Sequence, residues 1–312
     1  MIQSLFIQGT EKAIYKQTLL LSPVNHVSLE TPINREDDKR KVINGMSFNP
    51  AENALYLSFH LIRTNGKSAY GGGVQTISLD NLNIKSHLCY TCKEGIVLGL
   101  CFVRFTGSLL VAKGDRLVTR SRGVNVNDQE EREWVKVDHA KLSLRGSVHF
   151  AELPNAQVVF GARRSKRLQL LRVTDDHYIE MGTIIQLSAR YRDFDASSVA
   201  GDTLVALIYA AKNCRSLVFL YKVVANSTLE QISRISLPQV RRIHWYNDKL
   251  IAACRNGQSA LELFFSNGAL VRRGEHFRSN RVRVWCVAEN CIAIIEKQTE
   301  SEELLSIERV LM

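Results

Sequence analysis

Short apolar runs separated by polar turns recur along this chain from its beginning to its end. Residues 54–59 and 204–211 are typical runs, rich in Leu, Val, Ile, Phe, Tyr and Ala, and Asn, Asp, Gly and Ser lie between the runs. Runs of this length, bounded by such residues, are typical of β-strands. Long stretches with apolar residues at helical spacing are hard to find. The pattern therefore predicts an all-β protein.

One unit recurs six times: an aromatic residue ends a short strand, a polar turn follows, and a strongly apolar strand comes next. The spacings between these aromatics are 54, 48, 44, 51 and 40 residues. A period of about 40 to 50 residues predicts the four-stranded blades of a β-propeller. The six aromatics are Phe48, Phe102, Phe150, Phe194, Trp245 and Trp285.

The second half of the unit recurs in five copies, as a third strand, a turn and a fourth strand. In the second copy this turn is enlarged, at residues 120–132. The sixth copy ends at residues 303–311, where its third strand ends, so its fourth strand is missing. Residues 1–22 predict a hairpin, and one of its strands closes the ring by pairing with the C-terminal blade. Closure is favoured because an open end leaves unpaired backbone groups.

We therefore expect a single β-propeller domain over residues 1–312, with the closing hairpin at 1–22 and six repeats at 42–312. Six blades is the prediction, and seven is the alternative if the hairpin forms half a blade. The period and strand pattern resemble those of WD40-like β-propellers over nearly the whole chain. The chain lacks the Trp-Asp dipeptide and a clear Gly-His motif, so the resemblance is to a divergent propeller of no identified subfamily. A large β-sandwich pair or barrel is the alternative fold.

Composition limits the class of protein further. With 45% hydrophobic and 23% charged residues, the chain lies in the globular range. No apolar run reaches the roughly 18 residues that a membrane span needs. The N-terminus also lacks the basic segment and long apolar core of a secretory signal. Seven cysteines, an odd number, favour reduced thiols and an intracellular protein, in the nucleus or the cytoplasm.

Motifs that carry catalysis are missing from the sequence. Neither a Gly-x-Ser-x-Gly elbow nor a Gly-x-x-x-x-Gly-Lys loop occurs, and Gly71–Gly73 reads as a flexible loop end before a strand. Cys89 and Cys92 have the spacing of half a zinc site but no second pair. We therefore expect no enzyme activity, no cofactor and no metal. His149 and His244 each precede a strand-ending aromatic, which predicts a shared structural role such as a hydrogen bond between blades.

The charge of the chain is its most informative chemical feature. The net charge is +10, from 41 Lys and Arg against 31 Asp and Glu. In a propeller, the loops between second and third strands open on the same face as the loops between blades. Cations gather in these loops, whereas the opposite turns carry acids such as Asp175 and Asp176. The predicted partner- or anion-binding residues are Arg163, Arg164, Lys166, Arg167, Arg190, Arg192, Lys212, Arg215, Arg241, Arg242, Arg272, Arg273 and Arg281.

A concentrated cationic face attracts anionic partners, and arginine favours forked contacts to carboxylate or phosphate. The alternative is a solvated surface on which the arginines pair with neighbouring acids. We expect a non-catalytic scaffold of an intracellular multiprotein assembly, whose protein partners present acidic surfaces or peptides. The alternative is a nucleic-acid or chromatin binder, favoured by Tyr191, Trp245 and Phe277 near arginines, since aromatics stack on unpaired bases. An enzyme that uses the central channel is the third class.

Overall fold

A computed structural model describes most of the strands of the chain. In β1, β2, β6, β10 and β23 to β25 it describes the backbone alone. The described residues are 3–5, 14–21, 39–63, 69–80, 84–91, 96–114, 116–120, 131–136, 148–162, 164–210, 215–224, 228–246, 249–254, 259–266, 269–277, 281–288, 291–297 and 303–310.

Within these residues the strands form antiparallel sheets, and five of the sheets are four-stranded with strands that follow one another in sequence. The first sheet holds β3 (Lys39–Asn49), β4 (Ala54–Arg63), β5 (Ala69–Ser78) and β6 (Ile84–Thr91). The second holds β7 (Val97–Val103), β8 (Ser108–Lys113), β9 (Arg116–Arg120) and β10 (Glu131–Lys136). The third holds β11 (Val148–Glu152), β12 (Gln157–Ala162), β13 (Arg167–Val173) and β14 (Ile179–Gln186).

The fourth and fifth sheets repeat this order. The fourth holds β15 (Tyr191–Val199), β16 (Asp202–Ala210), β17 (Arg215–Val224) and β18 (Thr228–Pro238). The fifth holds β19 (Val240–Tyr246), β20 (Lys249–Cys254), β21 (Ser259–Ser266) and β22 (Ala269–Phe277). A short 3-10 helix, η2 (Pro50–Glu52), fills the first turn, where the Asn49 side chain accepts a hydrogen bond from the Ala51 N–H at 3.1 Å.

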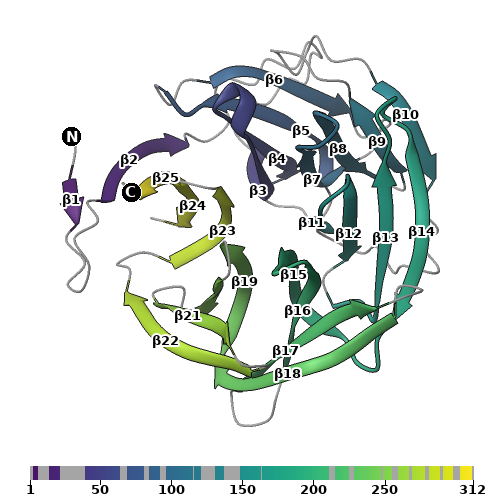
Figure 1. Cartoon of the computed structure of the whole chain (residues 1–312). Helices are drawn as coiled ribbons and strands as arrows, with labels where there is room; N and C mark the ends of the chain where they lie inside the picture. Colours follow the sequence, from purple (N-terminus) through teal and green to yellow (C-terminus); the bar gives the residue numbers. More distant parts are fainter. Residues whose placement is uncertain are drawn as a thin grey trace.

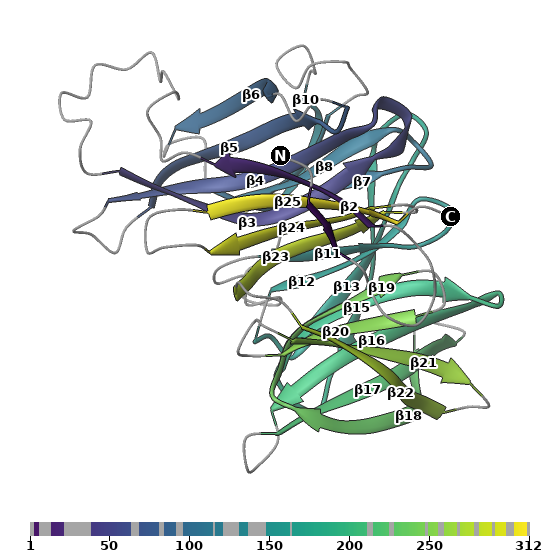
Figure 2. The same cartoon turned by 90° about the vertical axis from the view of Figure 1, so that its left-hand side faces the viewer.

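The last sheet joins the two ends of the chain. Its order is β1 (Gln3–Leu5), β2 (Ile14–Leu21), β25 (Glu303–Val310), β24 (Cys291–Lys297) and β23 (Arg281–Ala288). β2 runs antiparallel to β25 along its whole length, from Ile14 opposite Val310 to Leu21 opposite Glu303. Figure 2 shows β2 (purple) beside β25 (yellow). The chain is thus all-β with several four-stranded antiparallel sheets, as the sequence predicted.

The sheets are arranged around a common axis, with the first strand of each innermost (Figure 1). These inner strands lie next to one another in sequence order, and β23 lies against β3. Turns between first and second strands, and between third and fourth, open on one side, which we call the lower face. The remaining connections, including those between sheets, open on the other side, the upper face.

Apolar layers between neighbouring sheets form the core. Leu204, Ala206 and Ile208 pack toward the fifth sheet, whereas Val205 and Leu207 pack toward the third. Successive side chains of a strand point to opposite faces, so a strand between two layers is apolar at every position. This is why the apolar run is continuous over residues 204–209, all of which are buried. The repeated aromatics Phe102, Phe150, Phe194 and Trp245 are all buried in inner strands: Phe102 and Trp245 lie one residue before the strand end, whereas Phe150 and Phe194 lie in the middle of β11 and β15.

The prediction that the three consecutive glycines form a flexible loop end is wrong. Gly71, Gly72 and Gly73 lie within β5 and pair with both β4 and β6. A Cβ on Gly72 would lie 2.6 Å from the Phe59 carbonyl oxygen, so the glycine permits a close backbone approach. Within the described residues, no helix is long and apolar enough to cross a membrane.

The inner strands approach so closely that Gly99 has no room for a side chain. A Cβ at this position of β7 would lie 2.3 Å from the backbone oxygen of Val148 on β11. We expect Gly99→Ala to lower the free energy of unfolding by about 1 to 3 kcal/mol, because a backbone neighbour must move. Urea unfolding measures this. Ser198→Ala, at an exposed position of β15, is the control and should change stability little; equal effects of the two substitutions would contradict the close approach.

Candidate docking surface

The connection between β12 and β13 presents cations on the upper face. Arg164 and Lys166 are exposed there, and Ser165 between them is buried. The Ser165 N–H donates to the Ala162 carbonyl at 3.1 Å, and its hydroxyl accepts from the Arg167 N–H at 3.0 Å. Arg164 has a φ of 63°, a left-handed conformation that is uncommon for a side-chain-bearing residue. The loop is therefore held in one tight turn.

This turn is bonded to the segment that enters the fourth sheet. The Lys166 carbonyl accepts from the Leu187 N–H at 2.7 Å, and the Ser165 carbonyl accepts from the Tyr191 N–H at 3.1 Å. The Tyr191 hydroxyl donates to the Arg167 carbonyl at 3.3 Å. Arg190 and Arg192, on either side of Tyr191, are thereby brought beside the cations of the β12–β13 turn.

Tyr191 itself is part of this structure rather than of the exposed surface. Its side chain is buried, and burial raises the pKa of its hydroxyl well above the usual range, with Asp193 and Tyr209 adding to the effect. A Cβ on Gly161 would lie 2.3 Å from the Tyr191 oxygen, so the glycine makes room for the ring. Trp245 is buried as well. Neither ring offers an exposed stacking surface, and the side chain of Phe277 lies outside the described residues.

The next sheet repeats the same type of connection. Ser216, at the start of β17, accepts from the Val240 N–H at 3.0 Å and donates to the Val240 carbonyl at 3.3 Å. Arg215 is exposed and its guanidinium donates to the Ser236 hydroxyl at 2.8 Å and to the Ser236 carbonyl at 3.1 Å. Arg241 is exposed beside Val240. Arg215 and Arg241 are thus placed together on the upper face.

The other predicted cations either lie away from the upper-face loops or have side chains that are not among the described ones. Arg272 and Arg273 were expected in a loop between blades, and this is wrong: both lie within β22, whose pairing with β21 continues to Phe277 through a bulge. Arg272 is exposed on this outermost strand. Arg281 begins β23, but its side chain and that of Arg273 are not described. Arg163, Lys212 and most of the enlarged turn at 120–132 lie outside the described residues.

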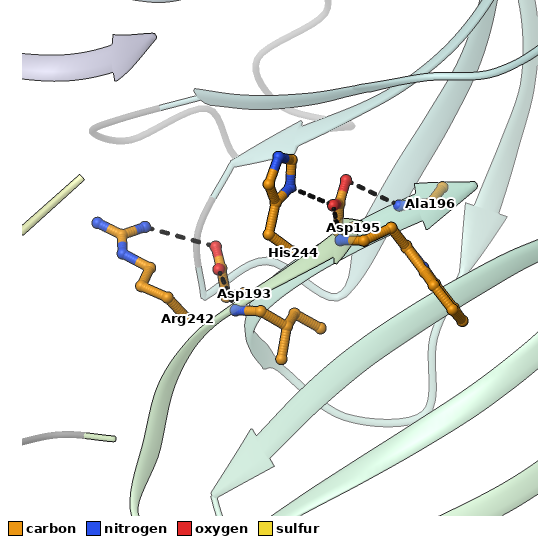
Figure 3. Close-up of polar contacts among 7 residues, drawn as sticks. Asp193, Asp195, Ala196, Arg242 and His244 are labelled. Carbon is orange, nitrogen blue, oxygen red and sulfur yellow. Dashed lines mark hydrogen bonds and ion pairs between the residues drawn. The ribbon is translucent and has the colours of Figure 1, made fainter. Parts of the chain in front are cut away.

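Arg242 takes part in a buried seam between β15 and β19, and the upper-face surface does not include it. Its guanidinium lies 3.5 Å from the carboxylate of Asp193, and the exposed fractions of the two side chains are 11% and 2%. The other oxygen of Asp193 accepts from the Ile243 N–H at 3.2 Å. Figure 3 shows both acidic side chains of β15 pointing toward β19.

Two residues further along, Asp195 repeats this arrangement. It contacts the His244 Nδ1, accepts from the Trp245 N–H at 2.7 Å, and accepts from the Ala196 N–H at 2.9 Å (Figure 3). The prediction of a hydrogen bond between blades is therefore confirmed for His244. His149, on β11, packs edge-on against the Phe194 ring of β15 with centroids 5.1 Å apart. Asp195 thus interacts with histidines from both neighbouring sheets.

This seam was not predicted from the sequence, although a signal was present. Asp193 and Asp195 are two residues apart, as are Arg242 and His244, so each pair shares one face of its strand. Two acids on one strand facing two cations on the next inner strand would have predicted an ion-paired contact. Among the described residues, no group of three or more His, Cys, Asp or Glu side chains is placed to hold a metal ion.

Comparisons with known proteins add the fold class. No protein-family model matches the chain, and no curated protein matches it by sequence. By structure, the chain is similar to the WD40 domain of Toxoplasma gondii coronin, with a TM-score of 0.54 at 7% identity, covering 100% of this chain and 89% of that one. It is also similar to a candidate 6-phosphogluconolactonase from Bacteroides fragilis, with a TM-score of 0.53 at 12% identity, covering 75% and 84%. A corresponding protein from Bacteroides uniformis gives 0.53 at 13% identity, covering 75% and 85%.

At these identities the likenesses show the fold alone. The fold is of the β-propeller type and WD40-like, in agreement with the resemblance drawn from the repeat. The subfamily stays open, because the neighbours differ in kind.

The buried seam makes stability depend on pH. Burial by itself would raise the pKa of Asp195, but the charge and hydrogen bond of His244, with His149 and the Trp245 N–H, hold that pKa below its ordinary value of 3.8. A carboxylate with a lowered pKa stabilises the folded state above the unfolded value, and this stabilisation is lost as the pH falls through the lower, folded value. We therefore expect the free energy of unfolding to fall below about pH 4.

Asp195→Asn should make this loss less steep and should lower stability at neutral pH by about 3 to 5 kcal/mol, since His244 loses its charged partner. Urea unfolding at a series of pH values measures both effects. Asp175→Asn, at an exposed carboxylate in the β13–β14 turn, is the control and should leave the slope unchanged. The same acid slope for Asp195→Asn and the unsubstituted chain would contradict the role of the seam.

Proposed function

We propose that this chain is a single six-bladed β-propeller over residues 1–312 that acts as a non-catalytic docking scaffold in an intracellular multiprotein assembly. β2 supplies the outer strand of the sixth blade, and β23 lies against β3, which supports a closed ring. The WD40-like fold supports protein binding as the role, because propellers of this class offer rigid loops on which recognition varies.

The observation that carries the proposal is the fixed cluster of exposed cations on the upper face. Arg164, Lys166 and Arg190 are exposed, and their segments are joined by the backbone hydrogen bonds of Lys166 with Leu187 and of Ser165 with Tyr191. A cation held on a rigid turn loses little entropy when a partner binds it. Arg215 and Arg241 continue the cationic surface over the next sheet. We call these five residues the basic rim.

The partner that fits the basic rim is a protein surface or peptide rich in carboxylates. Binding of single-stranded nucleic acid gains much of its strength from bases stacked on aromatic rings. Tyr191 and Trp245 are buried, so they do not supply such rings. The basic rim thus offers positive charges in fixed positions but no exposed aromatic ring, which favours an acidic protein partner over single-stranded nucleic acid.

Charge reversal at the rim tests the proposal. We expect Lys166→Glu together with Arg190→Glu to reduce capture of partner proteins from cell extract roughly tenfold, which corresponds to about 1.4 kcal/mol. Arg172→Glu with Arg234→Glu, at exposed positions of β13 and β18, changes the net charge equally and is the control. Captured proteins are measured by quantitative mass spectrometry, with and without nuclease.

Three outcomes are informative. Proteins that survive nuclease and are lost only with the rim variant support a protein-docking scaffold. Loss of the captured set on nuclease treatment assigns the rim to nucleic acid instead. Equal capture by all three proteins removes the rim from the account.

A further inference from the structure

Two large aromatic side chains are exposed on the lower face, opposite the basic rim. Phe105, in the turn between β7 and β8, is 63% exposed, and Tyr178, in the turn before β14, is 55% exposed. Val271 is the other large hydrophobic residue exposed in the described part of the chain. Elsewhere the aromatic rings with known exposure are buried or partly buried. Exposed aromatic rings on a stable fold are typical of binding surfaces.

Hydrogen bonds join the two turns across the boundary between the second and third sheets. The Ser108 hydroxyl lies 2.6 Å from Nδ1 of His177, and the Thr119 hydroxyl donates to the His177 carbonyl at 2.6 Å. The Arg104 N–H and its side chain both donate to the Glu152 carboxylate, at 2.6 and 2.8 Å. Each aromatic is therefore next to a residue that is fixed to the neighbouring sheet.

The turn that carries Tyr178 is itself closed by local bonds. The Thr174 N–H donates to the Tyr178 carbonyl at 2.9 Å, and the Tyr178 N–H donates to the Thr174 hydroxyl at 3.0 Å. His177 has a φ of 67° and is held by the bonds to Ser108 and Thr119. The backbone beneath the ring is thus fixed while the ring faces solvent, so binding would order little besides the side chain.

The charge around the rings decides which partner fits. Asp175 and Asp176 are exposed in the same turn as Tyr178. Glu152 already pairs with Arg104, and Glu180 lies opposite Arg172 across the β13–β14 ladder. The Arg104–Glu152 ion pair is neutral overall, and Arg172 and Glu180 carry opposite charges, so the two aspartates give the turn a negative charge. A ring in the same turn as two exposed carboxylates suits a guanidinium, which stacks on an aromatic ring and forks to a carboxylate.

We propose that Phe105, Tyr178, Asp175 and Asp176 form a second docking site, which binds an arginine-bearing segment of a partner protein. The occupant carries the opposite charge from the partner of the basic rim. The propeller therefore presents two faces with complementary charge preferences. The lower-face site stands independently of the role proposed for the rim.

Binding of a defined peptide to the full chain tests the proposal. The probe is Gly-Ser-Arg-Gly-Arg-Ser-Gly with a neutral fluorophore, measured by fluorescence anisotropy. We expect saturable binding below about 1 mM, and a peptide with citrulline in place of arginine should bind at least roughly tenfold more weakly, because citrulline keeps the shape and lacks the charge. Absence of binding by the unsubstituted protein, or equal binding of the citrulline peptide, would overturn the proposal.

Substitutions assign the binding to the named residues. Tyr178→Ala should weaken it roughly five- to thirtyfold, whereas Tyr178→Phe, which keeps the ring, should bind almost as the unsubstituted chain. Asp175→Asn with Asp176→Asn should weaken binding and flatten its dependence on salt. All these positions are exposed, so the fold should be retained, as circular dichroism and urea unfolding would check. Unchanged affinity in both Tyr178→Ala and Phe105→Ala would contradict the site.

The rim variant separates this site from the proposed function. Lys166→Glu with Arg190→Glu should bind the arginine peptide with unchanged or slightly higher affinity, since those residues lie on the upper face. A loss of binding in that variant would show that the peptide binds elsewhere and would also overturn the lower-face site. Failure of the rim to capture partners would leave this result unaffected.

Discussion

The backbone N–H groups along the inner edge of each sheet have no neighbouring strand of the same sheet to bond to. The rest of the structure depends on how these groups find hydrogen-bond partners. The first strand of a sheet has backbone N–H groups on the side where no strand of its own sheet pairs with it, and such groups need partners. At the boundary between the first and second sheets and at that between the fourth and fifth, side chains of the preceding inner strand supply them. The Ser47 hydroxyl accepts from the Phe102 N–H at 2.8 Å, and Asp193 and Asp195 accept from the Ile243 and Trp245 N–H groups.

This solution requires close approach of the inner strands and therefore small residues beside them. Gly99 on β7 permits contact with β11, and Gly45 on β3 faces the Gly99 Cα across the first boundary. Apolar layers from all parts of the strands then fill the space between neighbouring sheets. Because adjacent sheets are joined at the inner edge and packed further out, the turns on each face keep fixed positions. A rim of cations on one face and exposed aromatic rings on the other can then serve as preorganised surfaces.

Much of the fold could be predicted from the sequence, because each aromatic of the repeat lies in an inner strand, although Phe150 and Phe194 lie in the middle of their strands and do not end them. A strand that is buried on both faces has a continuous apolar run, as in the run at 204–209, and a strand that is buried on one face has alternating apolar and polar residues. The three consecutive glycines around Gly72 led to a wrong prediction, because glycine permits both a flexible loop and a close approach of two backbones. Only the position of the Phe59 carbonyl on the neighbouring strand decides between the two. Arg272 was wrongly predicted to lie in a loop between blades, because a bulge in β22 lets this strand continue beyond the point where the sequence pattern ends it.

The sites were less predictable than the fold for a physical reason. Arg164, Lys166 and Arg190 could be assigned to one face once the strand order was known, because topology alone sets the face. Arg242 could not be separated from them, since its ion pair depends on Asp193, which is 49 residues away. Tyr178 and Phe105 gave no signal in the sequence, because the exposure of an aromatic ring depends on packing that brings distant turns together.

The measurement that tests this account most directly is hydrogen exchange of the inner-strand amides in the intact protein under native conditions. The amides of Phe102, Ile243 and Trp245 should exchange as slowly as those in the middle of β12, because their side-chain acceptors hold them until the sheets separate. Exchange of these three amides at the rate of surface turns would contradict the account, because the sheets would then not be joined at their inner edges.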